Sequence, residues 1–382
     1  MKMNGAMRVS QYHCCRHINH IDEQSGGYNQ ETSKPMITIR NLAKELELSP
    51  TTVSVVLNSS PLARTIPEKT KNRVRAAAKK LGYSPNPFAL SLFNRRSVTV
   101  AILLSDLTDP YCMSVLKGID TSLHRSNYLP VLLDSENSRT KFKRNLQKLV
   151  DRRVEGIIGV ANSALLENEL LTTIQKYKIP VVLIGRDMEG TAISSVSIEN
   201  ESGTHLAMKH LYDLGHRSIA FLKGPGDIVD SAQRWEGVVR FSREIGFKID
   251  PKLTAELRLS DSSYEEGTIA AQELLRRNRK FTALLAFDDM TAFGAIRALT
   301  QAGKNVPADC SVVGFDDVTI ATFYNPPLTT IRQPMEVLGA SAVEIFFELA
   351  SAFFEKRAMA PIHRKIQPKL VARESTAPFR GR

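Results

Sequence analysis

The chain has 382 residues, of which 42% are hydrophobic and 24% charged, and its formal net charge is +11. This length exceeds one ordinary domain and predicts a globular protein of two or three domains. The sequence has no run of 18 apolar residues that would cross a membrane and no apolar core of a secretory signal near its start. Four cysteines, two of them adjacent, form no disulfide framework. We therefore expect a cytoplasmic protein.

The first 35 residues are polar and show no hydrophobic periodicity, so we expect residues 1–35 to be disordered. Several metal-ligand types occur there: His13, Cys14, Cys15, His17 and His20. Adjacent cysteines without a second pair do not match zinc-ligand spacing, and we predict no metal ion. Met36 precedes the first predicted helix, and we hypothesise that translation starts there. The intact mass of the native protein tests this, since a species carrying residues 1–35 contradicts it.

Two short helices joined by a tight turn are predicted within residues 38–58. Thr38 is suited to cap the first helix, and Ser49 followed by Pro50 to begin the second. An apolar stripe defines the first helix: Ile39, Leu42, Ala43 and Leu46. In the second helix, Val53, Val56 and Leu57 are expected to face the core, and Thr51, Thr52, Ser54 and Val55 to point outward. Such a helix-turn-helix can place its second helix in the major groove of DNA, although an ordinary helical hairpin has the same pattern.

A third helix is predicted over residues 67–82, beginning at Pro67 and ending at Gly82. Residues 36–96 contain 11 Lys and Arg against 3 Asp and Glu, and this net charge of +8 is most of the excess in the whole chain. Such a concentration is typical of a module that binds the phosphate backbone. We therefore predict a DNA-binding headpiece over residues 36–82.

Residues 83–96 are expected to link the headpiece to the rest of the chain. Asn86 and Pro87 can begin one more short helix, which is too short to be stable alone in water. A plain linker is the alternative, but linkers are usually polar and this one is rich in apolar residues: Phe88, Leu90, Leu92 and Phe93.

Between residues 97 and 382, apolar and β-branched runs alternate with helical periodicity. SVTVAILLSD, EGIIGVA, IPVVLIG, SIAFLKG and SVVGFDD are examples of the expected strands. This alternation predicts parallel sheets built from βαβ units, and there are too many units for one sheet, so two lobes are expected. Ligands of such sheets bind at the carboxyl ends of the strands, in the cleft between the lobes.

Several motifs together resemble those of the lac repressor and galactose repressor family of bacterial transcription regulators. They are ITIRNLAKELELSPTTVSVVLN, LGYSPNPFALSL, HLYDLGHRSIAFLKGP, FDDMTAFGAIRAL and SVVGFDD…PPLTTIRQP, in the family's order. The resemblance implies a small all-α helix-turn-helix headpiece and an α/β effector-binding and dimerisation domain like the two-lobe type I periplasmic binding proteins. It also implies three crossovers between the lobes, near 195–198, 326–330 and 355–362.

The resemblance also implies DNA contacts. Leu92 is expected to enter the minor groove and kink the duplex. The other expected contacts are Thr38, Ser49, Thr51, Thr52, Ser54, Val55, Asn58 and Arg64. Val55 stands where the family frequently has an arginine or histidine, so we predict an A·T or weakly specified base pair there, contacted through a thymine methyl group. Leu90 replaces a frequent basic residue, which weakens phosphate anchoring.

By motif position and strand ends, the expected effector contacts are Asp109, Tyr111, Arg186, Arg234, Asp288 and Asp316. Carboxylates and a guanidinium suit the paired hydroxyls of a sugar. Asp288 and Gly185 replace the asparagine and aspartate usual in the family, which leaves the effector class open. Arg186 either replaces the effector contact that the missing aspartate makes in the family, or is an exposed charge of the loop without a role in binding. Trp235 faces the ligand or packs between the lobes, and Asp317 is expected to bond within its own turn.

The sequence thus predicts a homodimeric, ligand-responsive transcription regulator, a repressor in most family members, that acts at the nucleoid on a near-palindromic DNA operator. Its effector is expected to be a small sugar or sugar derivative. We expect no cofactor and no enzymatic activity, because the sequence lacks phosphate-loop, nucleophile-elbow and zinc-protease motifs. The alternatives are a nucleobase-responsive regulator of the same fold and a soluble sugar-binding protein without a DNA role. Without a leucine heptad near the C-terminus, no tetramer-forming tail is expected.

Overall fold

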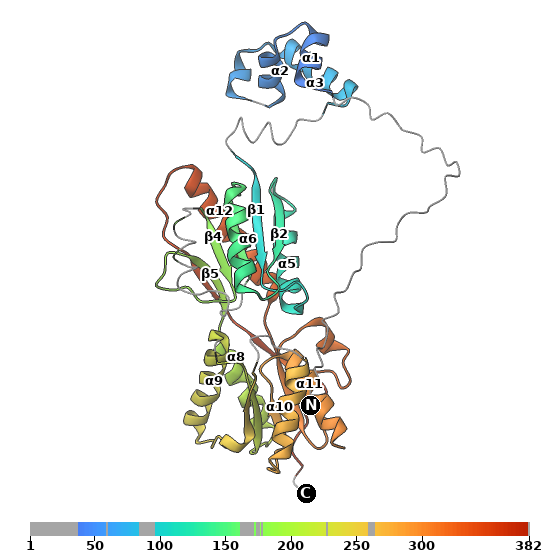
Figure 1. The fold of residues 1–382 in the computed structure, drawn as a ribbon, viewed down its shortest axis with the longest axis vertical. Helices are drawn as coiled ribbons and strands as arrows, with labels where there is room; N and C mark the ends of the chain where they lie inside the picture. The colour runs from blue at the N-terminus through green and yellow to red at the C-terminus, as the bar shows by residue number, and fades with distance from the viewer. Residues whose placement is uncertain are drawn as a thin grey trace, which may run out of the picture. The chain divides into compact units, whose positions relative to one another are not determined.

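The computed structural model describes residues 37–58, 60–83, 96–160, 172, 176, 179–226, 228–258 and 264–380. These residues belong to two compact units, a helical headpiece (residues 37–83) and a larger α/β unit (residues 96–380) (Figure 1). The segment 1–35 and the predicted linker helix with Leu92 lie outside the described residues.

The headpiece contains α1 (Ile39–Leu46), α2 (Pro50–Leu57), the 3-10 helix η1 (Pro61–Thr65) and α3 (Glu68–Leu81). Local side chains set the helix ends: Thr38 caps α1 in a capping box with Asn41, and the backbone N–H of Thr52 donates to Ser49 Oγ at 3.0 Å. Gly82 ends α3 with φ +68°, a conformation that favours glycine. The three α-helices share one core: Leu42, Ala43, Leu46, Val53, Val56, Val74 and Ala78.

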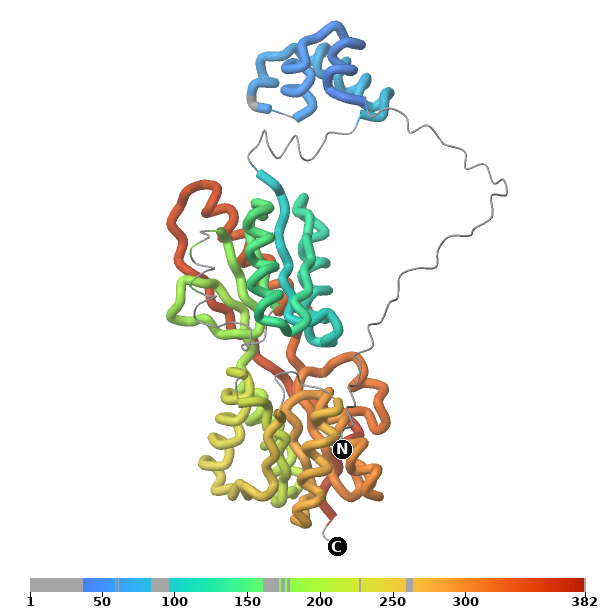
Figure 2. Tube along the Cα trace, in the orientation of Figure 1, coloured from blue at the N-terminus to red at the C-terminus, as the bar shows by residue number. Residues whose placement is uncertain are grey.

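The larger unit consists of two lobes (Figure 2), and each lobe is built on a six-stranded sheet. The strands of lobe 1 are β1 (Thr99–Leu104), β2 (Leu129–Asp134), β3 (Gly156–Val160), β4 (Val181–Ile184), β5 (Ser194–Ile198) and β11 (His363–Ile366). Those of lobe 2 are β6 (Ile219–Lys223), β7 (Thr254–Glu256), β8 (Ala283–Leu285), β9 (Ser311–Asp316), β10 (Thr329–Arg332) and β12 (Lys369–Val371). The strand orders are β11-β5-β4-β3-β1-β2 and β12-β10-β9-β8-β6-β7. Among these described strands all neighbours are parallel except β10 and β12.

Helices cover both faces of each sheet. In lobe 1 they are α5 (Pro110–Leu123), α6 (Arg139–Asp151) and α12 (Met335–Phe354). In lobe 2 they are α8 (Asn200–Asp213), α9 (Val229–Ile245), α10 (Tyr264–Arg276) and α11 (Asp289–Gln301), with the 3-10 helices η3 (Pro251–Leu253) and η4 (Thr319–Thr322). Successive strand residues pack on opposite faces of the sheet. Ile102 of β1 lies in a core with residues of α5 and α12, whereas Leu103 lies in a core with residues of α6. Strands buried on both faces explain the continuous apolar runs in the sequence.

The described chain crosses between the lobes after β5, after β10 and after β11. The first crossing follows Ile198, at the end of the predicted range 195–198. The second lies at residues 333–334 and the third at 367–368, so the predicted positions near 326–330 and 355–362 are wrong. The reason is that β10 and β11 are strands of the lobe sheets, where their backbone groups find hydrogen-bond partners on β9 and β5.

Helix α12 is, among the described residues, the one helix long and apolar enough to cross a membrane. It packs instead against α5 and against β3, β4 and β5. Its buried side chains include Leu338, Ala342, Val343, Ile345 and Phe346. The apolar composition of α12 is therefore that of a core helix.

Candidate effector cleft and DNA-binding surface

A cavity of about 460 Å³ lies between the two lobes, at the carboxyl ends of β1, β4 and β9. Five of the six predicted effector contacts line this one cavity: Asp109, Tyr111, Arg234, Asp288 and Asp316. The sixth, Arg186, is not among its lining residues, although its positive charge acts on Asp230. Gly185, the preceding residue, does line the cavity and turns the chain with φ +94°. An aspartate there would be strained, which is consistent with the glycine at this position.

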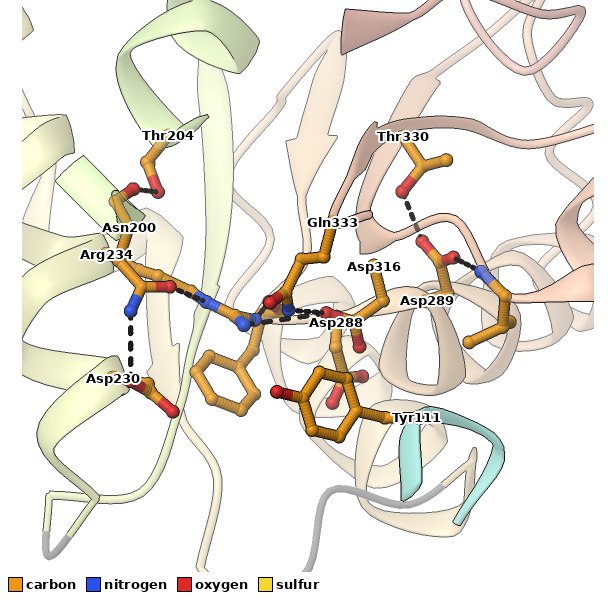
Figure 3. Close-up of polar contacts among 12 residues, drawn as sticks. Tyr111, Asn200, Thr204, Asp230, Arg234, Asp288, Asp289, Asp316, Thr330 and Gln333 are labelled. Carbon is orange, nitrogen blue, oxygen red and sulfur yellow. Dashed lines mark hydrogen bonds and ion pairs between the residues drawn. The ribbon is translucent and has the colours of Figure 1, made fainter. Parts of the chain in front are cut away.

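Arg234, on α9, is held by partners from other elements of the cleft (Figure 3). Its Nε donates to Asn200 Oδ1 at 3.0 Å, and its Nη1 donates to the Phe287 carbonyl oxygen at 2.6 Å. Its Nη2 lies 3.5 Å from Asp316 Oδ1. The guanidinium also lies 3.8 Å from the centre of the Phe315 ring, a favourable cation–π contact. With 11% of its side chain exposed, Arg234 is a fixed positive charge in the cleft.

Asp316 ends β9 in a conformation that is strained for an aspartate, with φ +124°, and Asp317 follows with φ +61°. Gln333 Nε2 donates to Asp316 Oδ1 at 2.6 Å. Burial raises the pKa of Asp316 well above its usual value, against the opposing effect of the nearby guanidinium. Asp317 does not line the cavity and pairs with Arg332 and Arg373, at 2.5 Å each. The strained turn therefore directs only the first carboxylate into the cleft.

Asp288 and Asp289 are neighbours in sequence, but their carboxylates bond to different partners (Figure 3). Asp288 caps α11: its Oδ1 accepts from the Thr291 backbone N–H at 2.8 Å and from the Thr291 hydroxyl at 2.9 Å. Its Oδ2 has no hydrogen-bond partner among the described residues. Asp289 is fully buried, and its carboxylate accepts from the Val318 backbone N–H at 2.9 Å and from the Thr330 hydroxyl at 2.5 Å. Asp288 thus offers an oxygen to a ligand, and Asp289 holds lobe 2 together.

Asp109 and Tyr111 stand where α5 begins, on the lobe 1 side of the cleft. The Tyr111 backbone N–H donates to Asp109 Oδ1 at 2.9 Å, which caps α5. Burial raises the pKa of Tyr111 well above its usual value, so its phenol is neutral and can donate a hydrogen bond. Cys112 is buried next to them, and burial raises the pKa of its thiol to about 12, so it is a core residue rather than a wall of the cavity or a reactive group.

The sequence analysis missed three polar residues of this network: Asn200, Asp230 and Gln333. Asn200 Nδ2 donates to Asp230 Oδ1 at 2.9 Å, and burial raises the pKa of Asp230. Asp230 precedes Arg234 by four residues on α9, and this helical spacing was a usable signal. Asn200 and Gln333 lie at the first two crossings between lobes, so their position could be recognised only once those crossings were known.

Trp235 lies outside the large cavity. Its ring packs edge-on against Phe221 with ring centres 5.6 Å apart, at the partly buried edge of the lobe 2 core, so the expectation that it packs between the lobes is wrong. Trp235 lines a small pocket with Arg234 and Phe287, and a contact with the ligand stays a prediction.

The outward face of α2 differs from the prediction at one position. Thr51 is exposed, and Thr52 and Ser54 are partly exposed, as expected. Val55 is only 8% exposed, so the prediction that it points outward is wrong. The chain after α2 folds back so that the Ser60 N–H donates to the Val55 carbonyl oxygen at 3.1 Å, and η1 packs beside α2. Val55 is therefore not presented for contact with a thymine methyl group.

Positive charge on the headpiece lies outside α2. The exposed basic residues are Arg40, Lys44, Arg64, Lys69, Arg73, Arg75, Lys79 and Lys80. Of the predicted contacts, Thr38 and Ser49 are helix caps with exposed side chains, and Asn58 donates from Nδ2 to Ser54 Oγ at 3.1 Å. A helix with hydroxyls but no guanidinium has few bidentate contacts to bases, so phosphate contacts are expected to supply most of the affinity for DNA.

Replacing Ser49 with alanine is expected to lower the free energy of unfolding of the headpiece by about 1 kcal/mol, because the Thr52 N–H loses its capping acceptor. Amide hydrogen exchange of headpiece residues in the full chain measures this change. Thr51→Ala, an exposed position on the same helix, is the control and should change the value by less than about 0.5 kcal/mol. Equal effects of the two substitutions would contradict the capping role.

Burial raises the pKa of Asp289 to about 8, far above that of an exposed aspartate. The folded state therefore binds this proton more tightly than the unfolded state, and folding stability should fall as the pH rises from about 4 to about 8. Asp289→Asn removes this ionisation, so its melting temperature should lose a few degrees less than the wild type between about pH 5 and about pH 8.5. Asp230 and Asp316 titrate in both proteins, and the charge of Asp289 raises the pKa of Asp316, so the difference reports Asp289 together with its effect on Asp316. Parallel melting curves would refute this assignment.

A basic helix-turn-helix headpiece and a two-lobed unit with a polar cleft define the class of ligand-regulated DNA-binding proteins. Residues 38–86 match the family described as bacterial regulatory proteins, lacI family, and residues 208–376 match the periplasmic binding protein-like domain. The chain belongs to the LacI family of transcription regulators, whose members bind DNA operators and small-molecule effectors as dimers.

Relatives span nearly the whole chain. The HTH-type transcriptional repressor PurR of Aliivibrio fischeri is 31% identical over 90% of this chain and 99% of its own length. The HTH-type transcriptional regulator RegA of Clostridium saccharobutylicum is 32% identical over 89% of this chain and 99% of its own. The crystal structure of the lac repressor dimer bound to operator and the anti-inducer ONPF is 28% identical, with a TM-score of 0.77 over 89% of this chain and 99% of that one. A complex of the transcriptional regulator CelR with cellobiose has 28% identity over the same shares and a TM-score of 0.65. The curated relatives named here are regulators, not enzymes.

Proposed function

We propose that this regulator represses transcription in the cytoplasm by binding a near-palindromic operator as a homodimer, and that a small hydroxylated effector in the 460 Å³ cleft controls the binding. The observation that carries the proposal is the convergence of five predicted contacts on one cavity between two lobes. Three crossings join these lobes, so closure around a ligand changes the position of one lobe relative to the other.

The proposed homodimer surface is an apolar groove that both lobes line. The cavity there has a volume of about 640 Å³, and its lining includes Met113 of α5, Leu132 of the edge strand β2 and Thr319 of lobe 2. Large apolar side chains are exposed on the same elements: Met113, Leu129, Leu132, Ile320 and Val337. An exposed strand edge with apolar side chains favours a partner, and the similar lac repressor structure is described as a dimer. Leu129→Asp is expected to shift the protein from dimer to monomer in analytical ultracentrifugation, and an unchanged dimer would contradict this surface.

The sugar proposal rests on the polar character of the cleft. The carboxyl groups of Asp288 and Asp316 line the cleft and can accept hydrogen bonds from the hydroxyls of a sugar. A purine is the second candidate, since several relatives are named PurR and the aromatic rings of Tyr111 and Phe287 line the cleft. A thermal-shift panel of sugars, sugar phosphates and purines separates them, and a shift by purines alone would overturn the sugar proposal.

Coupling between effector and operator must act in both directions, because each site biases the same equilibrium. If the effector weakens operator binding tenfold, the operator weakens effector binding tenfold.

The decisive experiment compares the full chain with a truncation that begins at Val98. The full chain should retard operator DNA in a gel, with affinity that falls steeply as salt rises. The truncation should keep effector binding and lose DNA binding. DNA binding that survives the deletion would contradict the assignment of the headpiece.

A further inference from the structure

The cleft contains a large excess of acidic side chains. Six acidic residues line it, namely Asp106, Asp109, Asp230, Glu265, Asp288 and Asp316. The one lysine or arginine among its described lining residues is Arg234. Arg186 adds a second positive charge near Asp230 without lining the cavity. Acidic side chains therefore outnumber basic ones even when both arginines are counted.

Arg234 has little capacity left to bind a negatively charged ligand. Its Nε and Nη1 already donate to Asn200 and to the Phe287 carbonyl oxygen, and its Nη2 faces Asp316. The guanidinium also lies over the Phe315 ring, at 3.8 Å. Arg234 therefore serves to hold the wall of the cleft together, and its charge partly neutralises the Asp316 carboxylate.

One other carboxylate, that of Asp288, has no comparable partner. Asp288 receives both its side-chain hydrogen bonds on Oδ1, from Thr291, and none of the described residues donates to its Oδ2. Asp288 is 4% exposed and lines the cavity from the start of α11, so this oxygen is open to a ligand there. Asp230 differs, because it accepts from the Asn200 amide at 2.9 Å and the positive charges of Arg234 and Arg186 act on it.

We propose that the effector carries a positively charged amino group beside its hydroxyl groups, as an amino sugar does, and that Asp288 binds that ammonium. This inference rests on the proposed role of the cleft as the effector site. An ammonium group brings a compensating charge when closure of the lobes expels water, whereas a neutral sugar leaves the Asp288 carboxylate desolvated and unpaired. A phosphate or carboxylate would face like charges on both lobes, with Arg234 already engaged.

Matched triplets of sugars test the proposal on the full-length protein. Each triplet contains the neutral sugar, its 2-amino form and its 6-phosphate, for glucose, galactose and mannose. At least one amino sugar is expected to raise the melting temperature by several degrees and to bind at least about tenfold more tightly than its neutral partner in calorimetry. No phosphate should bind. A neutral or phosphorylated sugar that binds best, or the lack of a shift with all three amino sugars, overturns the proposal.

The variant Asp288→Asn keeps a good helix cap and removes one negative charge. It should lose most of the preference for the amino sugar over the neutral sugar, whereas Asp213→Asn, an exposed position on α8 that pairs with Lys209, should keep that preference. An unchanged preference in Asp288→Asn contradicts the assignment. Gel retardation of operator DNA is measured in parallel: a purine or neutral sugar that modulates it refutes the amino-sugar proposal but leaves the regulator function intact. DNA binding by the truncation at Val98 refutes the proposed function itself.

Discussion

Arg234→Ala is expected to lower the free energy of unfolding of the larger unit by about 3–5 kcal/mol and to abolish the response of operator binding to the effector. The side chain contacts Asn200 of α8, the carbonyl oxygen of Phe287, and Asp316 at the end of β9. Its loss leaves the buried carboxyl group of Asp316 without its positive partner. Thermal and denaturant unfolding of the full chain give the change in stability. Operator binding titrated with effector gives the response, while the affinity for DNA without effector should change little because the headpiece is a separate unit.

Arg240→Ala is the matched control on the same helix α9. Its side chain is 46% exposed and pairs with Glu201 at 3.6 Å and with Glu244 at 3.4 Å. Surface pairs of this kind contribute about 0–1 kcal/mol, so this variant should keep both stability and the effector response. If the two arginine variants behaved alike, the central role of Arg234 in the cleft would be wrong.

Leu42→Ala is expected to unfold the headpiece and to weaken operator binding by more than about 100-fold, because the substitution costs about 2–5 kcal/mol in a unit with a small core. Leu42 is fully buried and packs with residues of all three α-helices. The melting temperature of the larger unit and its effector affinity should stay unchanged. Gel retardation and calorimetry of the full chain measure the two effects separately.

Leu62→Ala makes the same chemical change in the same headpiece, at a side chain that is 67% exposed. It should alter the stability of the headpiece by less than about 0.5 kcal/mol. A loss of melting temperature in the larger unit of the Leu42→Ala variant would show that the two units do not fold independently.

The sequence determined features that depend on short-range physics. Helix caps at Thr38 and Ser49 follow from side chains that reach backbone groups three residues away. The doubly wound sheets follow from apolar runs long enough for strands buried on both faces. The carboxyl ends of those strands then place Asp109 and Asp316 in one cleft, which is why five of the six predicted effector residues line the same cavity.

Only the tertiary structure decided the features that depend on which distant segments meet. Val55 is buried because the chain after α2 folds back against it. The hydrophobic periodicity of α2 does not predict the path of the chain that follows. The second and third crossings lie later in the chain than predicted, because β10 pairs with β9 and β11 pairs with β5. These partner strands are more than a dozen residues away in sequence. Asn200 and Gln333 join Arg234 and Asp316 only where the lobes meet, so the balance of charge in the cleft is a property of the assembled lobes. Local order is encoded by neighbours along the chain, whereas burial and charge depend on the neighbours that folding brings together.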